Sequence, residues 1–194
     1  MAGNSHFAEN FLKSTTKQFE YYKMLGEKAM DQLNDEQLFD VPHEDGNSIA
    51  IIVNHLRGNM LSRWTDFRTS DGEKAWRERD AEFENAFKTR SDIDRAWNEG
   101  WNVLFEALNS VNKENFDTRV YIRNQGHSIL EAVNRQLAHY AYHIGQMVLL
   151  ARMFKGAEWQ SLSIPRGESK TFNAQKFSQE KGDRHFTDEF LEEE

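Results

Sequence analysis

The 194-residue chain carries 24 Lys and Arg residues against 32 Asp and Glu residues, which gives a formal net charge of -8. An acidic chain has no general attraction for nucleic acid or anionic membranes, so we expect neither as a partner. There is no cysteine, which excludes disulfides, thiolate metal ligands and a cysteine nucleophile. Any metal site must therefore use imidazole or oxygen ligands.

The amount of apolar sequence predicts a single domain over residues 1–194. Hydrophobic residues make up 38% of the chain and aromatic residues 12%, which is enough for one sizeable core and too little for two comfortable domains. The first ten residues, MAGNSHFAEN, lack a basic region followed by an apolar run, and no segment approaches the roughly 20 apolar residues of a membrane-spanning helix. We therefore expect a cytoplasmic protein.

The first third of the chain predicts two amphipathic helices. Apolar residues recur mostly at spacings of three and four from Phe7 to Leu33. The segment NDEQLFDVPHEDGN then predicts a short helical turn and a loop. The second helix begins at Asn47 or Ser48, either of which can cap it, and its apolar stripe reaches Phe67 before Gly72.

A charged connection and a third helix follow. The stretch SDGEKAWRERDAEFENAFKTR has a weak pattern and predicts a connection with one helical turn. Ser91 with Asp94 resembles a capping box, and apolar residues from Ile93 to Val111 then repeat at helical spacing. The sequence TRVYIRNQGH predicts a short β-like hairpin with its turn at Asn124 to Gly126.

The fourth helix is the longest. Ser128 and Glu131 form a capping box, and the helix is expected to run to about Phe154 before Gly156 ends it. At ~27 residues it is about 40 Å long. We expect an all-α domain with its core at about residues 5–156, and an arm with an acidic tail at residues 157–194.

Two histidines lie in the apolar stripe of this fourth helix. The sequence QLAHYAYHIGQ places His139 and His143 four residues apart, so both project from one helix face. His55 lies in the apolar stripe of the second helix. A buried imidazole needs partners for both ring nitrogens, and a metal ion with a hydrogen-bond acceptor provides them. Three imidazoles from two packed helices can hold one divalent ion and leave positions for water or substrate.

Simpler interpretations stay open for these and other residues. A core histidine that hydrogen-bonds a neighbour is more frequent than a ligand. The remaining histidines lie near termini, loops or caps and are weaker candidates: His6, His43, His127 and His185. The acidic residues Asp80, Glu82 and Glu84 are interpreted as a solvated face, and Trp64, Trp97 and Trp101 as core residues. Three polar residues lie one turn from a histidine and fit supporting, packing or surface roles equally: Asn59, Gln136 and Gln146.

Several classes of enzyme are excluded by missing motifs. The chain has no HExxH sequence, no Glu-x-x-His pair, no glycine-rich phosphate loop and no GxSxG sequence. These absences argue against a zincin protease, a di-iron bundle, nucleotide-driven chemistry and a serine nucleophile.

The segments IIVNHLRGNMLSRWTDF and SILEAVNRQLAHYAYHIGQMVLLARMF resemble the DinB-like or YfiT-like superfamily of metal-dependent enzymes, in particular a bacterial branch of unknown function. SDGEK, SLSIPRGESKTFN and GHSILEAV are similar to that branch as well, and the resemblance spans about residues 5–178. It implies an up-down-down-up four-helix bundle, often dimeric, with one divalent ion, commonly nickel or zinc, on His55, His139 and His143. Some relatives are transferases or isomerases that use a low-molecular-weight thiol, and many have no known activity.

Three hypotheses follow. In the first, the metal activates a low-molecular-weight thiol, which attacks an electrophilic small-molecule substrate. In the second, a hydroxide replaces the thiolate and the protein is a hydrolase, although no residue is marked as the general base. In the third, the protein is a non-catalytic, metal-holding or structural dimer, for which Trp159 and Phe172 of the arm could provide contacts.

Overall fold

The protein is mostly helical, with one small antiparallel hairpin. The computed structural model describes residues 2–191, so the predicted acidic end at residues 192–194 lies outside them. Within the described residues the elements follow in the order α1 (Ala2–Asp31), α2 (Asp35–Phe39), α3 (Ile49–Trp64), the 3-10 helix η1 (Asp80–Phe83), α4 (Arg90–Asn109), β1 (Arg119–Ile122), β2 (Gln125–Ser128), α5 (Ile129–Lys155), the 3-10 helix η2 (Gly156–Glu158), α6 (Ser169–Phe177) and α7 (Asp188–Leu191).

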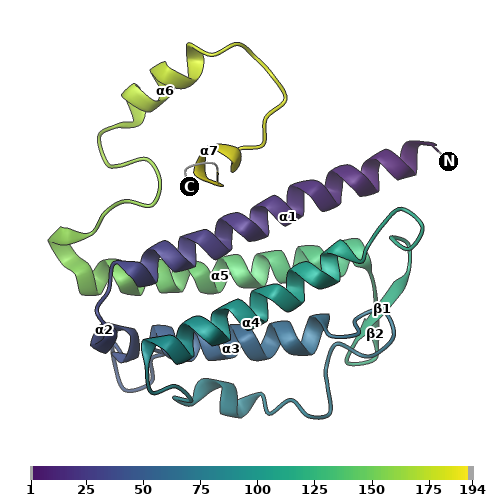
Figure 1. The fold of residues 1–194 in the computed structure, drawn as a ribbon, viewed down its shortest axis with the longest axis horizontal. Helices are drawn as coiled ribbons and strands as arrows, with labels where there is room; N and C mark the ends of the chain where they lie inside the picture. Colours follow the sequence, from purple (N-terminus) through teal and green to yellow (C-terminus); the bar gives the residue numbers. More distant parts are fainter. Residues whose placement is uncertain (1, 192–194) are drawn as a thin grey trace.

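The four long helices lie alongside one another. The most extensive packing joins α3 to α4 and α1 to α5, and α3 also packs against α5 and α1 against α4. In Figure 1, α1 and α5 run in one direction and α3 and α4 in the other. The contact between α3 and α5 matters most for function, because the predicted histidines lie on these two helices.

One continuous core fills the space between the long helices. Its centre is an aromatic group in which the Trp101 ring lies 6.4 Å from Phe19 and 5.9 Å from Tyr140. Trp64, Trp97 and Trp101 are all buried, as their helical spacing predicted. Aromatic rings at these separations stabilise the core beyond the area they bury.

The long helices begin where side chains cap them, with one correction to the sequence-based prediction. Ser48 caps α3 and Ser128 with Glu131 caps α5, both as expected. For α4, however, the capping box is formed by Thr89 and Asp92, not by Ser91 and Asp94. Thr89 Oγ1 accepts from the Asp92 amide at 3.2 Å, and the Asp92 carboxylate accepts from the Thr89 amide at 3.1 Å. Both halves of the motif are present only in this register.

Some helix ends also differ slightly from those expected from the sequence. The helix α1 begins before Phe7 and ends at Asp31, and α3 ends at Trp64, short of Phe67. The short helical turn predicted between them is α2. The helix α5 ends at Lys155 and is capped by Gly156, whose positive φ of 58° is one that glycine adopts without strain.

The hairpin turns one residue earlier than predicted. Arg123 and Asn124 have φ values of 55° and 61°, as a two-residue type I′ turn requires, whereas Gly126 pairs with Tyr121 in the strand ladder. The Asp71 carboxylate accepts from the amides of Arg123 and Asn124, each at 2.8 Å. These bonds compensate for an arginine in a conformation it rarely adopts, and they tie the hairpin to the segment that follows α3.

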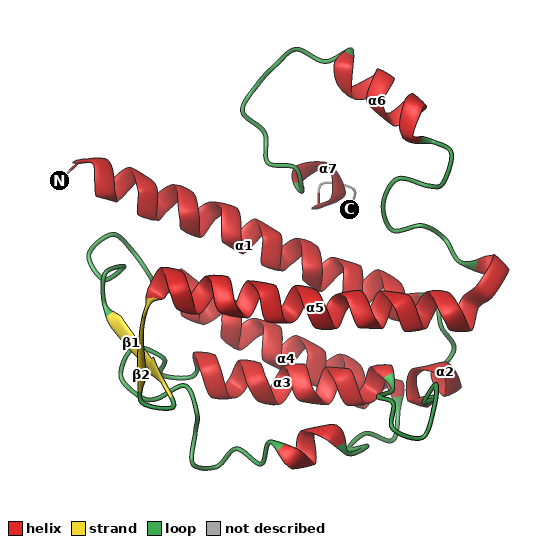
Figure 2. Ribbon diagram, turned by 180° about the vertical axis from the view of Figure 1, so that it is seen from behind, coloured by secondary structure: helices red, strands yellow, loops and turns green. Residues whose placement is uncertain are grey.

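The arm after α5 folds back toward α1. Figure 2 shows α6 and α7 on the α1 side of the molecule, away from η1. The Tyr21 ring of α1 lies 5.8 Å from Phe186 and 5.3 Å from Phe190. Aromatic contacts therefore attach the described part of the arm to the long helices.

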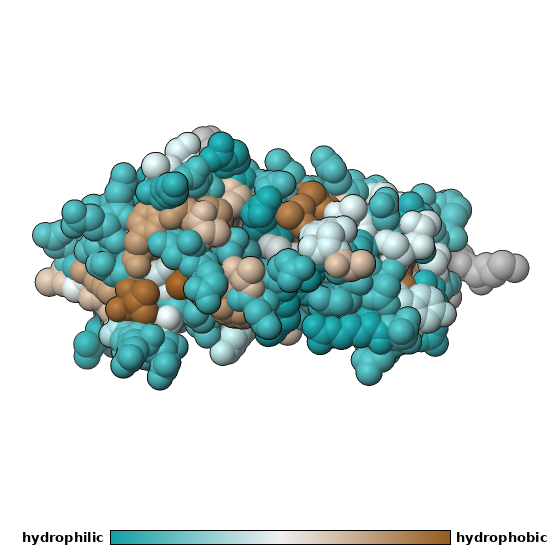
Figure 3. Space-filling view, turned by 90° about the horizontal axis from the view of Figure 1, so that it is seen from below, coloured by the Kyte–Doolittle hydropathy of each residue, from teal (hydrophilic) through white to brown (hydrophobic). Residues whose placement is uncertain are grey.

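The exterior is largely polar. Figure 3, which views the molecule from below, shows a mostly hydrophilic face with small hydrophobic patches. Within residues 2–191, none of the helices combines the length and the apolar character that crossing a bilayer demands.

Candidate metal centre

His55, His139 and His143 come together between α3 and α5. The Nε2 atom of His139 lies 3.1 Å from His143 Nε2 and 3.4 Å from His55 Nε2. One potential ligand atom from each of the three residues lies within 4.8 Å of the other two, and no other group of three or more such side chains occurs among the described residues. The residues that the sequence singled out therefore converge on one point.

Regular helix geometry and close packing explain this convergence. His139 and His143 are one turn apart on α5, and their ring centroids are 4.7 Å apart. His55 is buried in α3, and its ring is 5.4 Å from His139. The Phe83 ring stacks on the other side of His55 at 4.7 Å. The imidazole of His55 is thus held between α5 and η1.

The outer nitrogens of two rings already have acceptors. His55 Nδ1 lies 2.9 Å from Glu82 Oε2, and His143 Nδ1 lies 2.8 Å from Gln146 Oε1. A carboxylate and an amide oxygen accept hydrogen bonds, so each ring donates from Nδ1. A neutral imidazole with its proton on Nδ1 presents a lone pair at Nε2. Two lone pairs consequently face His139.

The third histidine cannot satisfy both of these lone pairs with a proton. A neutral His139 carries at most one N–H at Nε2, which it can donate either to His55 Nε2 or to His143 Nε2. In the other of these two contacts, two nitrogen lone pairs then face each other with no hydrogen between them. The pKa of His139 is lowered to about 3, first by burial and then by the neighbouring His143 and His55. Burial also lowers the pKa of His143. A divalent cation bound by the three nitrogens resolves this arrangement, so the residues fit a metal ion.

Glu82 is the functional residue that sequence reasoning missed. Asp80 and Glu84 are exposed as predicted, but Glu82 is buried, and its interpretation as part of a solvated face was wrong. Asn54 of α3 donates to the Glu82 carbonyl at 3.1 Å and so holds η1 against the helix. Burial by itself raises the pKa of Glu82, but the hydrogen bonds from His55 and Arg77 outweigh it and lower the pKa. Glu82 is therefore an ionised, buried acceptor for His55.

A glycine in α3 makes room for this carboxylate. A Cβ atom at Gly58 would lie 2.4 Å from Glu82 Oε1, which is closer than non-bonded atoms approach. A glycine inside a helix costs stability and indicates a close approach by another group. Gly58, three residues after His55, was the sequence signal for a group packed beside this histidine.

The remaining polar candidates divide between two roles. Gln146 contacts His143 directly, whereas Asn59 and Gln136 form a separate buried network. In that network the Tyr140 hydroxyl donates to Asn59 Oδ1 at 3.1 Å and accepts from Gln136 Nε2 at 3.0 Å. Trp64 Nε1 also donates to the Tyr140 hydroxyl, at 3.0 Å. This network fixes α5 against α3 next to the histidines.

Comparison with known proteins identifies a family but no activity. The sequence model of the family described as "Protein of unknown function (DUF1572)" matches residues 6–168. The chain belongs to this family. No curated protein and no solved structure gives a significant match. The DUF1572 region runs from α1 to the residue before α6 and contains all three histidines, so function has to be argued from the site.

In this DUF1572 protein the three clustered histidines, His55, His139 and His143, line a cavity of about 360 Å³. This volume lies at the lower end of the range for small-molecule sites. Tyr142, His139 and His143 face it from α5, and His55 and Asn59 face it from α3. Among the described residues no aspartate or glutamate lines this cavity.

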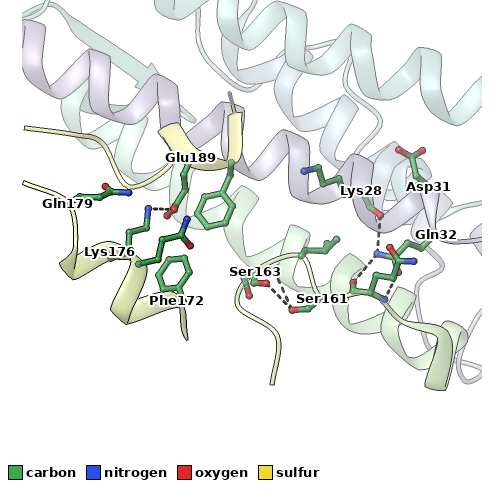
Figure 4. A pocket seen from close by; sticks show the side chains of 13 residues that line it. Lys28, Asp31, Gln32, Ser161, Ser163, Phe172, Lys176, Gln179 and Glu189 are labelled. Atoms are coloured by element: carbon green, nitrogen blue, oxygen red, sulfur yellow. Dashed lines mark hydrogen bonds and ion pairs between the residues drawn. The ribbon is translucent and has the colours of Figure 1, made fainter. Parts of the chain in front are cut away.

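A second cavity, of about 720 Å³, lies between α1 and the arm and shares no residue with the first. Figure 4 shows Lys28 and Gln32 of α1 on one side of it and Phe172 and Lys176 of α6 on another. Lys176 pairs there with Glu189 of α7. Phe172 thus lines the arm cavity, while Trp159 packs, half-buried, against the core.

The other four histidines lie outside the cluster, in line with the sequence-based ranking. His6 and His43 are exposed, and His127 lies in β2. His185 contacts the Ser14 hydroxyl at 3.0 Å and the Thr187 hydroxyl at 2.7 Å. These contacts give His185 a structural role in attaching the arm.

Proposed function

We propose that this DUF1572 protein is a metal-dependent enzyme in which His55, His139 and His143 hold one divalent ion, nickel or zinc. The observation that carries the proposal is the convergence of the three Nε2 atoms while Glu82 and Gln146 occupy the outer nitrogens of two rings. The packing pairs and directions of α1, α3, α4 and α5 support the proposal that these helices form a DinB-like, up-down-down-up bundle.

A divalent ion at such a site supplies Lewis acidity that lowers the pKa of a thiol or a water molecule toward neutrality. The residues of the chain prepare the site for it. Glu82 and Gln146 fix the orientation of His55 and His143, and the low pKa of His139 keeps that ring neutral at physiological pH. We propose that a low-molecular-weight thiol is the nucleophile and that the cavity binds an electrophilic small-molecule substrate for conjugation or isomerisation in the cytoplasm.

Metal-dependent hydrolysis is the second candidate, and the site supports it less well. A hydrolase of this kind needs a general base close to the attacking water. The nearest buried carboxylate, Glu82, already accepts from His55 with Oε2 and from Arg77 with both oxygens. A thiol that loses its proton to solvent does not need such a base.

We also propose that the protein forms a homodimer, whether or not it is an enzyme. Along one side of α5, Tyr142, which also lines the histidine cavity, Leu149 and Met153 are 63%, 59% and 60% exposed. These positions fall on one side of the helix, and an apolar stripe of this kind is typical of contact surfaces. Sedimentation of Leu149→Lys against the wild type tests this contact, and unchanged sedimentation would contradict it.

Metal content is the primary test of the proposed function. Protein purified without an affinity tag should contain one divalent ion per chain by elemental analysis. His139→Ala should lose the ion, and His43→Ala, which removes an exposed histidine outside the cluster, should keep it. Circular dichroism should show similar helix content in all three proteins. Tag-free protein without stoichiometric metal would overturn the proposal.

The reaction class is tested on the metal-loaded protein. We expect metal-dependent consumption of a low-molecular-weight thiol in the presence of an electrophile, and no turnover of simple esters or amides. Ester or amide turnover without thiol consumption would favour the hydrolase. Stoichiometric metal with neither activity would favour a non-catalytic role.

A further inference from the structure

The cavity of the histidine cluster is surrounded by positive charge. Five arginines line it, from α3, the segment before η1, the hairpin turn and α5: Arg63, Arg77, Arg79, Arg123 and Arg135. The whole chain has a net charge of -8, so the charge at this one place is opposite to that of the protein. A cavity lined by one sign of charge concentrates ligands of the other sign.

Carboxylates neutralise only part of this charge. Arg77 forms a two-point pair with Glu82, at 2.7 Å from Nε and 2.9 Å from Nη2. Glu73 is shared by three guanidinium groups, with Oε2 at 3.0 Å from Arg63, 3.2 Å from Arg77 and 3.3 Å from Arg123. The exposed Asp80 lies 3.9 Å from Arg79. Three carboxylates thus face five arginines, and only Glu73 and Glu82 are shielded from solvent.

Arg63 carries a donor that the protein does not use. This residue is only 7% exposed, yet its Nε has no hydrogen-bond partner among the described residues. Burial of such a donor is unfavourable unless something accepts from it. Arg63 lines the cavity, so an acceptor that enters the cavity from outside is a chemically suitable partner.

Three arginines present exposed guanidinium groups beside the cavity. The side chain of Arg135, on α5, makes no hydrogen bond or ion pair with any residue in the described part of the chain. The side chains of Arg79 and Arg123 are about half exposed, although each has one carboxylate nearby, Asp80 at 3.9 Å from Arg79 and Glu73 at 3.3 Å from Arg123. The Asp71 carboxylate accepts a hydrogen bond from the Arg123 amide and so fixes the turn that carries Arg123. These groups are available to a ligand and come from three separate segments.

We propose that the site binds a small organic acid, whose carboxylate is held by Arg79, Arg123 and Arg135 next to the histidine cluster. The guanidinium fork matches a carboxylate with two parallel hydrogen bonds. The cavity volume of about 360 Å³ restricts the ligand to a small molecule. This inference rests on the proposed function for the reaction, but binding of the carboxylate by the arginines does not require the metal.

The test uses the full-length, cobalt-loaded protein and isothermal titration calorimetry at constant ionic strength. Succinate should bind, and succinamide, which has the same skeleton without charge, should not. Arg135→Gln and Arg79→Gln should each weaken succinate binding by about tenfold or more, because each removes a charge-assisted hydrogen bond. Arg152→Gln, on the same helix but away from the cavity, should leave the affinity within about twofold of wild type.

Two further ligands show whether the carboxylate belongs to the substrate or to the thiol. Mercaptosuccinate carries both groups, and 2-mercaptoethanol carries only the thiol. If mercaptosuccinate binds more tightly than succinate and produces thiolate-to-cobalt absorption, the acid is part of the thiol. If succinate and 2-mercaptoethanol bind together, the acid is the second substrate. Both results support the carboxylate site.

Other outcomes overturn the proposal. Equal binding of succinate and succinamide, or unchanged succinate affinity in both Arg135→Gln and Arg79→Gln, would show that the arginines do not select a carboxylate. Preference for inorganic phosphate over succinate would contradict the choice of oxyanion. Failure of the metal site is separable, because His139→Ala should lose the metal and still bind succinate. A metal-loaded protein that binds no acid would refute this inference alone.

Discussion

His55 and Glu82 are 27 residues apart in the sequence, and a buried hydrogen bond of 2.9 Å joins His55 Nδ1 to Glu82 Oε2. Arg77 donates to both oxygens of the same carboxylate. A carboxylate behind an imidazole fixes the proton on the outer nitrogen and raises the basicity of the inner one. The strength of the candidate metal site therefore depends on η1, which contributes no ligand.

Replacing Glu82 by Gln should weaken metal binding without removing a ligand. The amide keeps the shape of the side chain but loses the charge that supports His55, so we expect a loss of about 10- to 100-fold in metal affinity. Competition with a chelator measures this change. Glu84→Gln, an exposed neighbour, is the matched control and should bind metal like the wild type. Equal affinities in the two variants would show that Glu82 does not support the site.

Replacing Gly58 by Ala should disturb the same carboxylate from the side of α3. The new methyl group would lie 2.4 Å from the Glu82 carboxylate, which must move away from His55. We expect weaker metal binding and a lower unfolding temperature. Gly145→Ala is the control, because a Cβ there meets nothing within 4 Å and alanine favours a helix by roughly 0.5–1 kcal/mol. A Gly58→Ala protein with wild-type metal affinity would contradict the proposed role of this contact.

The three candidate metal-binding histidines were predictable because they lie in regular elements. His139 and His143 share one face of a capped helix, and His55 lies in a second apolar stripe, so periodicity predicted that all three face the interior. His55 is buried, and His139 and His143 are half-buried. Their convergence depends on the packing of α3 on α5, which periodicity does not encode. The sequence pattern suggested grouping His55 with the other two because it lies in a second apolar stripe, and the resemblance to the DinB-like superfamily implied the same three residues.

The roles of Glu82 and of the five arginines were not predictable, because these residues do not belong to a shared repeating pattern. Glu82 lies in a charged segment without a repeating pattern, and its burial results from contacts of η1 with Asn54 and Gly58 of α3. The five arginines come from segments that are distant in the sequence, and only the folded chain gathers them around one cavity. A pattern of charges along a chain indicates exposure on average and does not reveal such tertiary sites.

Tyr140→Phe should lower stability while leaving metal content intact. Loss of the hydroxyl removes the bond to Asn59 and leaves Trp64 Nε1 buried without an acceptor. An unsatisfied buried donor costs about 1–3 kcal/mol in the free energy of unfolding. Urea denaturation measures this loss, and Tyr142→Phe, which alters an exposed residue on the same helix, should be nearly neutral. Equal stability of the two variants would show that the buried network contributes little.

The metal-free protein should lose stability as the pH falls from about 6.5 toward 3. His139 takes up a proton near pH 6.5 in the unfolded chain but only near pH 3 in the folded protein, because the folded environment lowers its pKa to about 3. Between these values the unfolded state binds more protons, so acidification favours unfolding, whereas above pH 6.5 the residue makes no difference. Chelator-treated wild type and His139→Gln should be compared by urea denaturation at about pH 7.5, 6 and 5. The free energy of unfolding should decline less in His139→Gln, while His43→Gln should follow the wild type; parallel declines in all three proteins would refute the assignment of this sensitivity to His139.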